Sequence, residues 1–194
     1  MQAEWDPVFV LLCEGNCAGA LEAARRFARK FGACLRSSML MAECLIALGR
    51  NDEAAVFTSQ AQEMVPGEDH PRLWMVWGTL YKKKGNLNLA EKWYRRAADA
   101  ADQRGLPQGL LAVVFAKQGK LQEANAAHRR ATRPGWDFLE GTCTTMGLVL
   151  RAEGRYREAI EWLQRALVRD PECAVARAEL AITIRALEIK EGGV

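Results

Sequence analysis

The sequence predicts an all-α solenoid built from antiparallel helix pairs, and two recurring residue types support that prediction. Glycines recur at intervals of 34 to 36 residues: Gly15, Gly49, Gly85, Gly119 and Gly154. Five residues after each glycine stands an alanine: Ala20, Ala54, Ala90, Ala124 and Ala159. Self-similarity at a period of this length is typical of proteins in which each helical hairpin stacks on the next. We identify no strand in the sequence.

Each recurring position has a physical role. The glycine follows the first helix of a pair, where the chain turns with a positive φ that glycine adopts without a Cβ clash. The alanine lies in the second helix, where a larger side chain would push the two helices apart. The matching small residues on the first helices are Ala42, Gly78, Ala112, Gly147 and Ala181. Twelve residues after the glycine, four of the five repeats carry another alanine, which faces the next repeat: Ala61, Ala97, Ala131 and Ala166.

The same pattern predicts five helix pairs and one final helix. The expected pairs are residues 7–14 with 17–31, 35–48 with 52–65, 71–84 with 87–101, 107–118 with 121–131, and 138–153 with 156–168. Pro66 and Pro171 end second helices, because proline cannot continue a helix. A last helix over about residues 172–190 has no second helix after it. Such a helix would cap the solenoid by covering the apolar flank of the fifth repeat.

Composition argues against several classes of function. The chain has 27 Lys and Arg residues against 24 Asp and Glu residues, and this net charge of +3 is too small to indicate nucleic-acid binding. No apolar run approaches the roughly 18 residues needed to span a bilayer. The N-terminal segment carries Glu4 and Asp6 and lacks the basic region of a secretory signal. We therefore expect a cytoplasmic protein that does not insert into a membrane.

The candidate chemical groups do not form a recognisable active or metal site. None of the six cysteines forms a C-x-x-C pair, and His70 and His128 lie near none of them, so zinc or haem has no support. The cysteines are Cys13, Cys17, Cys34, Cys44, Cys143 and Cys173, and we expect mostly buried free thiols. We find no paired carboxylates, no Ser-His-Asp arrangement and no phosphate-binding loop. The sequence thus predicts a protein that is not an enzyme and holds no cofactor.

Residues 71–97 carry the repeat most clearly. Its signature residues are Trp74, Trp77, Gly78, Tyr81, Gly85, Ala90, Tyr94 and Ala97. This spacing resembles the tetratricopeptide repeat, a helix–turn–helix unit of about 34 residues. The resemblance extends over five and a half repeats, at about residues 1–34, 35–70, 71–104, 105–139 and 140–173, with the final helix as the half repeat. It implies a single right-handed superhelical domain over residues 1–194, used as a scaffold for protein interactions.

In that family the first helices line a concave groove, and the register transfers to this sequence. The implied apolar floor is Met39, Leu40, Met75, Val76, Leu110, Val113, Leu148 and Ile182. The implied basic rim is Lys82, Lys83, Lys117, Arg151 and Arg185. Glu43, Arg72 and Thr79 occupy further groove positions. The alternative is that the floor residues bury one another and that the basic residues only cap helix ends.

An apolar groove with a basic rim is expected to hold an amphipathic helix or an extended segment of a protein or peptide partner. The Lys, Asn and Arg clamp with which chaperone adaptors of this family grip a C-terminal carboxylate is absent. Trp74, Trp77 and Tyr81 fall at core positions of the repeat, so packing explains them better than base stacking. The leading interpretation is a non-catalytic adaptor or chaperone-like module. The alternatives are self-association, through the groove or the last helix, into a homodimer, and a regulatory subunit of a larger complex.

Overall fold

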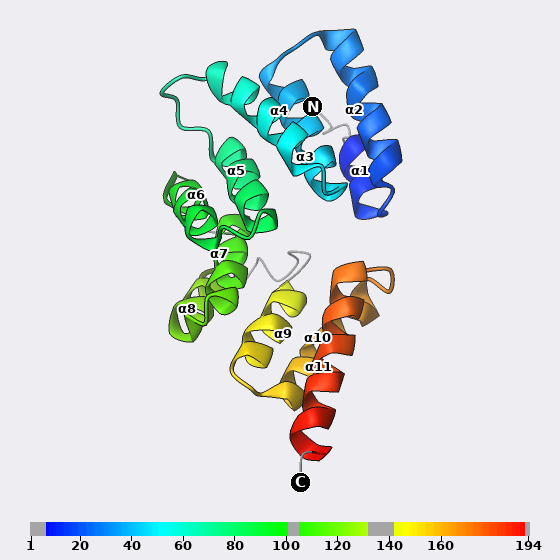
Figure 1. Cartoon of the computed structure of the whole chain (residues 1–194), viewed down its shortest axis with the longest axis vertical. Coiled ribbons are helices and arrows are strands. Elements are labelled where there is room, and N and C mark those ends of the chain that lie inside the picture. The colour runs from blue at the N-terminus through cyan, green and yellow to red at the C-terminus, as the bar shows by residue number, and fades with distance from the viewer. Residues whose placement is uncertain (1–6, 101–104, 132–141, 193–194) are drawn as a thin grey trace. The chain divides into compact units, whose positions relative to one another are not determined.

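A computed structural model describes residues 7–100, 105–131 and 142–192. Within these ranges every regular element is an α-helix, and no strand occurs in them. The chain divides into two compact units, residues 1–100 and residues 101–194 (Figure 1). Each unit is described separately below. The expectation of a single solenoid domain over residues 1–194 stays a prediction.

The unit of residues 1–100 contains three helix pairs. They are α1 (Pro7–Cys13) with α2 (Cys17–Phe31), α3 (Leu35–Ala47) with α4 (Asn51–Glu63), and α5 (Pro71–Lys83) with α6 (Leu87–Ala100). Each first helix packs against the second helix of its own pair. In addition α3 contacts α1, α2 and α5, and α4 contacts α5, so successive pairs stack (Figure 1). This packing is the predicted solenoid arrangement.

The unit of residues 101–194 repeats the same arrangement. It contains α7 (Leu106–Lys117), α8 (Leu121–Ala131), α9 (Thr142–Ala152), α10 (Tyr156–Arg169) and α11 (Ala174–Gly192). The central helix α9 contacts α7, α8, α10 and α11. The last helix packs on both α9 and α10, which is the position of a first helix in a sixth repeat. The expectation that the last helix covers the fifth repeat is therefore confirmed.

Most predicted helix ends lie within two residues of the observed ones. The largest difference concerns α11, which begins at Ala174 and continues to Gly192 instead of covering residues 172–190. The helix continues because Glu188 stands where the five repeats carry their turn glycine. Its last turn is also held in place, since Arg157 pairs with Glu191 at 2.8 Å and Lys190 donates to the Gly154 carbonyl at 3.3 Å. The expected start of α9, at residue 138, lies outside the described residues.

The small residues of the pattern have the predicted roles. The five turn glycines have φ between +74° and +79°. The five alanines that follow them in the second helices are fully buried. A Cβ added at Gly78 would lie 2.5 Å from the Tyr94 ring, and one at Gly147 would lie 2.5 Å from Leu163. Ala181 is the exception, because no described helix covers it and it is exposed.

Candidate interaction surfaces

The first helices α1, α3 and α5 form the predicted groove side of residues 1–100. Met39, Leu40 and Val76, which the sequence assigned to an apolar floor, are buried in the hydrophobic core, and Met75 is half-buried. Met39 and Leu40 are buried because α3 is in contact with α1, α2, α4 and α5, and Val76 is buried because α5 is in contact with α3, α4 and α6. Leu40 and Val76 belong to one hydrophobic cluster, as in the alternative in which floor residues bury one another, whereas Met39 packs in a second cluster with Ala61, Val65 and Leu73.

The polar residues predicted for this face are engaged within the unit. Arg72 on α5 forms a two-bond ion pair with Glu43 on α3, with Nη2–Oε2 at 3.0 Å and Nε–Oε1 at 3.3 Å. Thr79 donates to the Met75 carbonyl at 2.9 Å and shares a 2.9 Å hydrogen bond with the Tyr94 hydroxyl. An exposed ion pair of this kind contributes at most about 1 kcal/mol. Its main effect here is to link two neighbouring first helices.

Some residues of the predicted basic rim contact neighbouring side chains, and others are exposed. The Lys82 ammonium lies 6.0 Å from the centre of the Tyr94 ring, at the outer limit of a cation–π contact. Lys83 and Lys117 are exposed at the ends of α5 and α7. Arg151 on α9 donates to Glu179 on α11 at 2.8 Å, so its charge is balanced by a neighbouring helix. Arg185 is exposed on α11.

Exposed apolar residues of the unit of residues 101–194 gather on α11. Val175, Ile182 and Ile189 are 59%, 50% and 68% exposed, and they recur at seven-residue intervals, so they lie along one side of the helix. Ala178 and Arg185 lie on the same side. We call these five residues the α11 apolar row. Of the other floor residues predicted in this unit, Leu110 and Val113 on α7 are half-buried and Leu148 on α9 is buried.

Two exposed or concave features were not foreseen. Phe9 on α1 is exposed and occupies the same repeat position as Glu43 and Thr79. The groove register would have identified it had it been carried back into the first repeat. The α11 apolar row is different in this respect. The same register assigns Val175 and Ala178 to the groove side of the last helix, and Ile189 follows Ile182 by seven residues.

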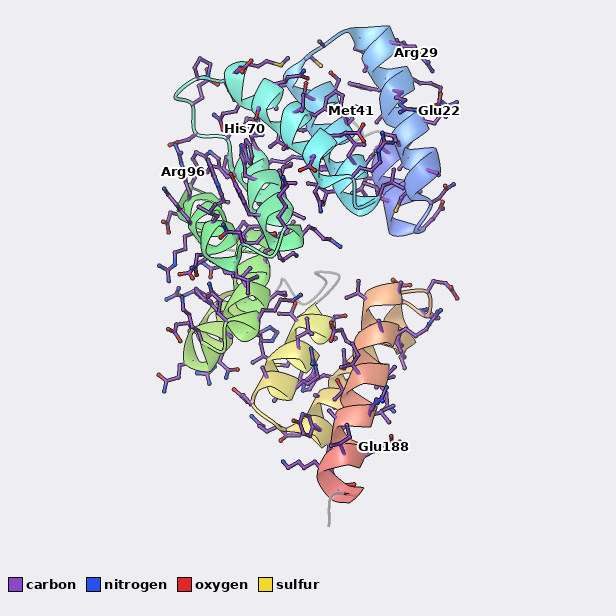
Figure 2. All side chains as sticks on the ribbon, viewed as in Figure 1. Glu22, Arg29, Met41, His70, Arg96 and Glu188 are labelled. Atoms are coloured by element: carbon purple, nitrogen blue, oxygen red, sulfur yellow. The ribbon has the colours of Figure 1, made fainter. Side chains whose placement is uncertain are left out.

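The second unforeseen feature is an open depression of about 780 Å³ beside α6. Arg96, labelled in Figure 2, stacks on the Trp74 ring at 4.0 Å and lies 3.9 Å from Asp69. Arg95 pairs with Glu91 at 2.8 Å. Since acids and bases alternate around the depression and pair with each other, it has no strong preference for a charged ligand.

The aromatic residues of the third repeat serve packing. Trp74 and Tyr94 are among the largest fully buried side chains. Trp77 is half-buried and stacks on both Tyr81 and Trp93, with ring centres 5.7 Å apart in each case. Such stacks contribute to the cohesion of a helix pair beyond the buried area. Core positions therefore account for these residues, as the repeat pattern predicted.

The described residues hold no group of three or more His, Cys, Asp or Glu side chains that could bind a metal ion. Five of the described cysteines are reduced thiols outside any disulfide: Cys17, Cys34, Cys44, Cys143 and Cys173. Cys34 caps the start of α3, and its hydrogen bond with Ser37 lowers the pKa of the thiol. In the described part of the chain, no helix is both long and apolar enough to cross a membrane.

Comparison with known proteins agrees with this geometry. Family profiles described as tetratricopeptide repeat match residues 11–69, 71–104 and 144–183. No curated protein sequence matches the chain. Among solved structures, a thermophilic tetratricopeptide repeat protein of Thermus thermophilus has a TM-score of 0.73 at 18% identity. The match covers 91% of this chain and 95% of that one.

Two further solved structures resemble the chain. One is a tetratricopeptide repeat protein from Parabacteroides merdae, with a TM-score of 0.61, 11% identity and coverage of 93% of this chain and 70% of that one. The other is YrrB, described as a tetratricopeptide repeat protein with an unusual peptide-binding site, with a TM-score of 0.54 at 16% identity. That match covers 88% of this chain and 87% of that one. Identities this low establish the fold alone. Because the three family matches together cover more than half of the sequence, and the helix pairs stack as the repeat requires, the chain belongs to the tetratricopeptide repeat family.

Proposed function

We propose that the protein is a non-catalytic scaffold that holds an amphipathic helix or an extended segment of a protein partner. Membership of the tetratricopeptide repeat family supports a protein-interaction scaffold in general. The proposed site is the first-helix side of residues 101–194, formed by α7, α9 and α11. This side includes the predicted residues Leu110, Val113, Leu148, Ile182 and Arg185.

The observation that carries the proposal is the exposure of the α11 apolar row. Large apolar side chains that are exposed side by side usually mark an interaction surface, whereas isolated ones do not. Val175, Ile182 and Ile189 are each at least half exposed and lie along one side of a single helix. The equivalent side of residues 1–100 supports a partner less well. Its apolar residues are mostly buried and its polar pair, Glu43 with Arg72, is satisfied internally.

The residue types of this surface indicate the chemistry of the partner. A row with spacings of three and four residues complements the apolar side of an amphipathic helix, or alternate side chains of an extended segment. Arg185 lies within the row, and exposed Lys117 ends α7, the helix on the other side of α9. Complementary charge steers partners and fixes their orientation. The proposed partner segment is therefore apolar on one side and acidic beside it.

Partner capture by a variant of this row tests the proposal. Replacing both Val175 and Ile182 by Asp should remove the partners bound by the wild type, because two buried carboxylates would face apolar groups of the partner. Because both side chains are largely exposed, helical circular dichroism should not change. The measurement is quantitative mass spectrometry of proteins retained from an extract of the source cells, followed by titration of each retained partner.

A matched control is available elsewhere in the chain. The pair Val56→Asp and Val168→Asp replaces two exposed valines on the second helices α4 and α10. This control should retain the same partners as the wild type. Equal retention of every partner by the α11 variant would show that the row is not the binding site.

A further inference from the structure

A second surface of α11 lacks the covering helix that its counterparts have. In the second to fifth repeats, the small residue at the position of Ala181 is buried beneath a second helix: Ala42, Gly78, Ala112 and Gly147. Ala181 itself is exposed. One helical turn later, Ile184 is 39% exposed, whereas its counterparts Leu45, Phe115 and Leu150 are at most 5% exposed and its counterpart Tyr81 is half-buried. In the described part of the chain no helix lies on this side of α11, so its packing surface is vacant.

The charges on this surface indicate what could cover it. Arg177, Ala181, Ile184 and Glu188 follow each other at spacings of four, three and four residues, so they share one side of the helix. We call them the α11 outer face. At the position of Arg177, the other described repeats bury uncharged residues: Ser38, Trp74, Gln108 and Cys143. A second helix of the usual kind, which meets an uncharged residue at this position, would remove the Arg177 guanidinium from water. Burying this charge costs free energy even though Glu172 lies 3.5 Å from it. A covering helix with an acid opposite Arg177 and a small residue opposite Ile184 would complement this surface in charge and in size.

The same helix of another copy has both features. We propose that the protein forms a symmetric dimer in which α11 packs antiparallel against α11 of a second copy through the outer face. With a two-fold axis passing between residues 182 and 183, Arg177 lies opposite Glu188 of the second copy. Ala181 then lies opposite Ile184 of the second copy. The face is complementary to itself in charge and in size, as an isologous interface requires.

In the single chain, the charged groups at both ends of the outer face are exposed to solvent. Arg177 donates through Nη2 to the Pro171 carbonyl at 2.6 Å and lies 3.5 Å from Glu172, and both partners are exposed in the segment just before α11. A guanidinium has five N–H donors, so these contacts leave others for a carboxylate. Glu188 projects from the second half of α11 (Figure 2) and is exposed. The contacts of Lys190 and Glu191 with the α9–α10 hairpin keep this half of the helix in place.

The outer face is distinct from the apolar row proposed for a partner. Ile184 and Ile182 differ by about 200° around an α-helix, so they point to nearly opposite sides. The two surfaces adjoin each other only along Ala178, Ala181 and Arg185, which are three and four residues apart. A single helix pair buries less than the roughly 1,200 Å² of a standard stable interface. The dimer should therefore dissociate on dilution, and salt should weaken it because the end pairs are exposed to solvent.

Sedimentation equilibrium with charge-exchange variants tests this dimer. The wild type should approach twice its 21.6 kDa monomer mass as concentration rises. Arg177→Glu alone and Glu188→Arg alone should each remain monomeric, because each places like charges opposite each other at both ends of the interface. An equimolar mixture of the two variants should regain the dimer mass, since acids of one copy then face bases of the other at both ends. The double variant should also dimerise.

Three results would overturn the dimer. They are a wild type that stays monomeric at all concentrations, single variants that associate as strongly as the wild type, and a mixture that stays monomeric although each variant has native helical circular dichroism. None of them bears on the proposed partner site, since the α11 apolar row is unchanged in every variant.

Discussion

At the scale of single residues, close contacts between the helices of a pair explain the recurring small residues. Gly78 packs against the ring of Tyr94, and Gly147 packs against Leu163. In the fourth repeat Ala112 replaces the glycine, and the residue at the position of Tyr94 is the smaller His128. At Gly78 and Gly147 the absence of a Cβ therefore leaves room for the side chain on the second helix.

We expect Gly78→Ala to destabilise the protein. In an open helix this change stabilises by about 1 kcal/mol, because alanine is the better helix former. Here the new Cβ would lie 2.5 Å from the ring of Tyr94, which is fully buried and whose hydroxyl is hydrogen-bonded to Thr79. Overpacking of this kind costs about 1–3 kcal/mol. The measurement is the free energy of unfolding in urea.

Gly109→Ala is the matched control for that change. Gly109 lies inside α7, and the nearest atom to an added Cβ is the Ala131 Cβ at 4.0 Å, an ordinary contact. This variant should be stabilised by about 0.5–1 kcal/mol. If both variants changed stability in the same direction, close packing would not be the reason for glycine at position 78.

His128 gives a second expectation at this scale, a dependence of stability on pH. The side chain is buried in α8, and burial lowers its pKa below the ordinary value. The unfolded chain, with a histidine pKa of about 6.5, therefore binds the proton more readily than the folded chain does. The contribution of His128 to the free energy of unfolding is therefore fully present above pH 6.5. It is lost as the pH decreases from there toward the lower pKa of the folded chain, by at most about 1.4 kcal/mol per pH unit.

His128→Gln should remove this contribution while keeping a side chain of similar size. Urea unfolding between pH 7.5 and pH 5 should show a shallower decline for the variant than for the wild type. Parallel curves for the two proteins would mean that other groups account for the whole decline.

At the scale of helices, the exposure of a groove position depends on its neighbours. Met39 and Leu40 on α3 and Leu148 on α9 are buried, and both helices lie between two other first helices. Phe9 on α1 and Ile182 on α11 are exposed, and each of these helices contacts one first helix in the described chain. Ion pairs between first helices, Glu43 with Arg72 and Arg151 with Glu179, reinforce the stacking at modest energy.

Val76→Ala tests whether a predicted floor residue belongs to the core. Val76 is buried on α5, so removing its two methyl groups should cost about 1–3 kcal/mol in lost burial and cavity formation. Val56→Ala on α4 changes the same atoms at an exposed site and should alter stability by less than about 0.5 kcal/mol. Urea unfolding of both variants decides the point. Equal effects would mean that Val76 is not a core residue.

At the scale of the whole molecule, the tetratricopeptide repeat organises each of the two compact units in the same way. The proposed functions use surfaces that the repeat leaves uncovered on its final helix. The α11 apolar row is assigned to a protein partner, and the α11 outer face to a second copy. In the described part of the chain α11 packs on α9 and α10 and on no other helix, which explains why both candidate surfaces occur on it.

The amino-acid sequence by itself determined the helix pairs, their boundaries to within about two residues, and the family. These features depend on local constraints, since a turn with positive φ needs glycine and a close helix crossing needs a small residue at a fixed interval. Only the tertiary structure decided which of the predicted groove residues are exposed. Burial of Met39, Val76 or Leu148 depends on helices about 35 residues away in the sequence, and exposure of Ile182 and Ala181 depends on the absence of such a neighbour in the described chain. A register shared by every repeat cannot distinguish these cases, because it assigns the same role to a central helix and to a terminal one.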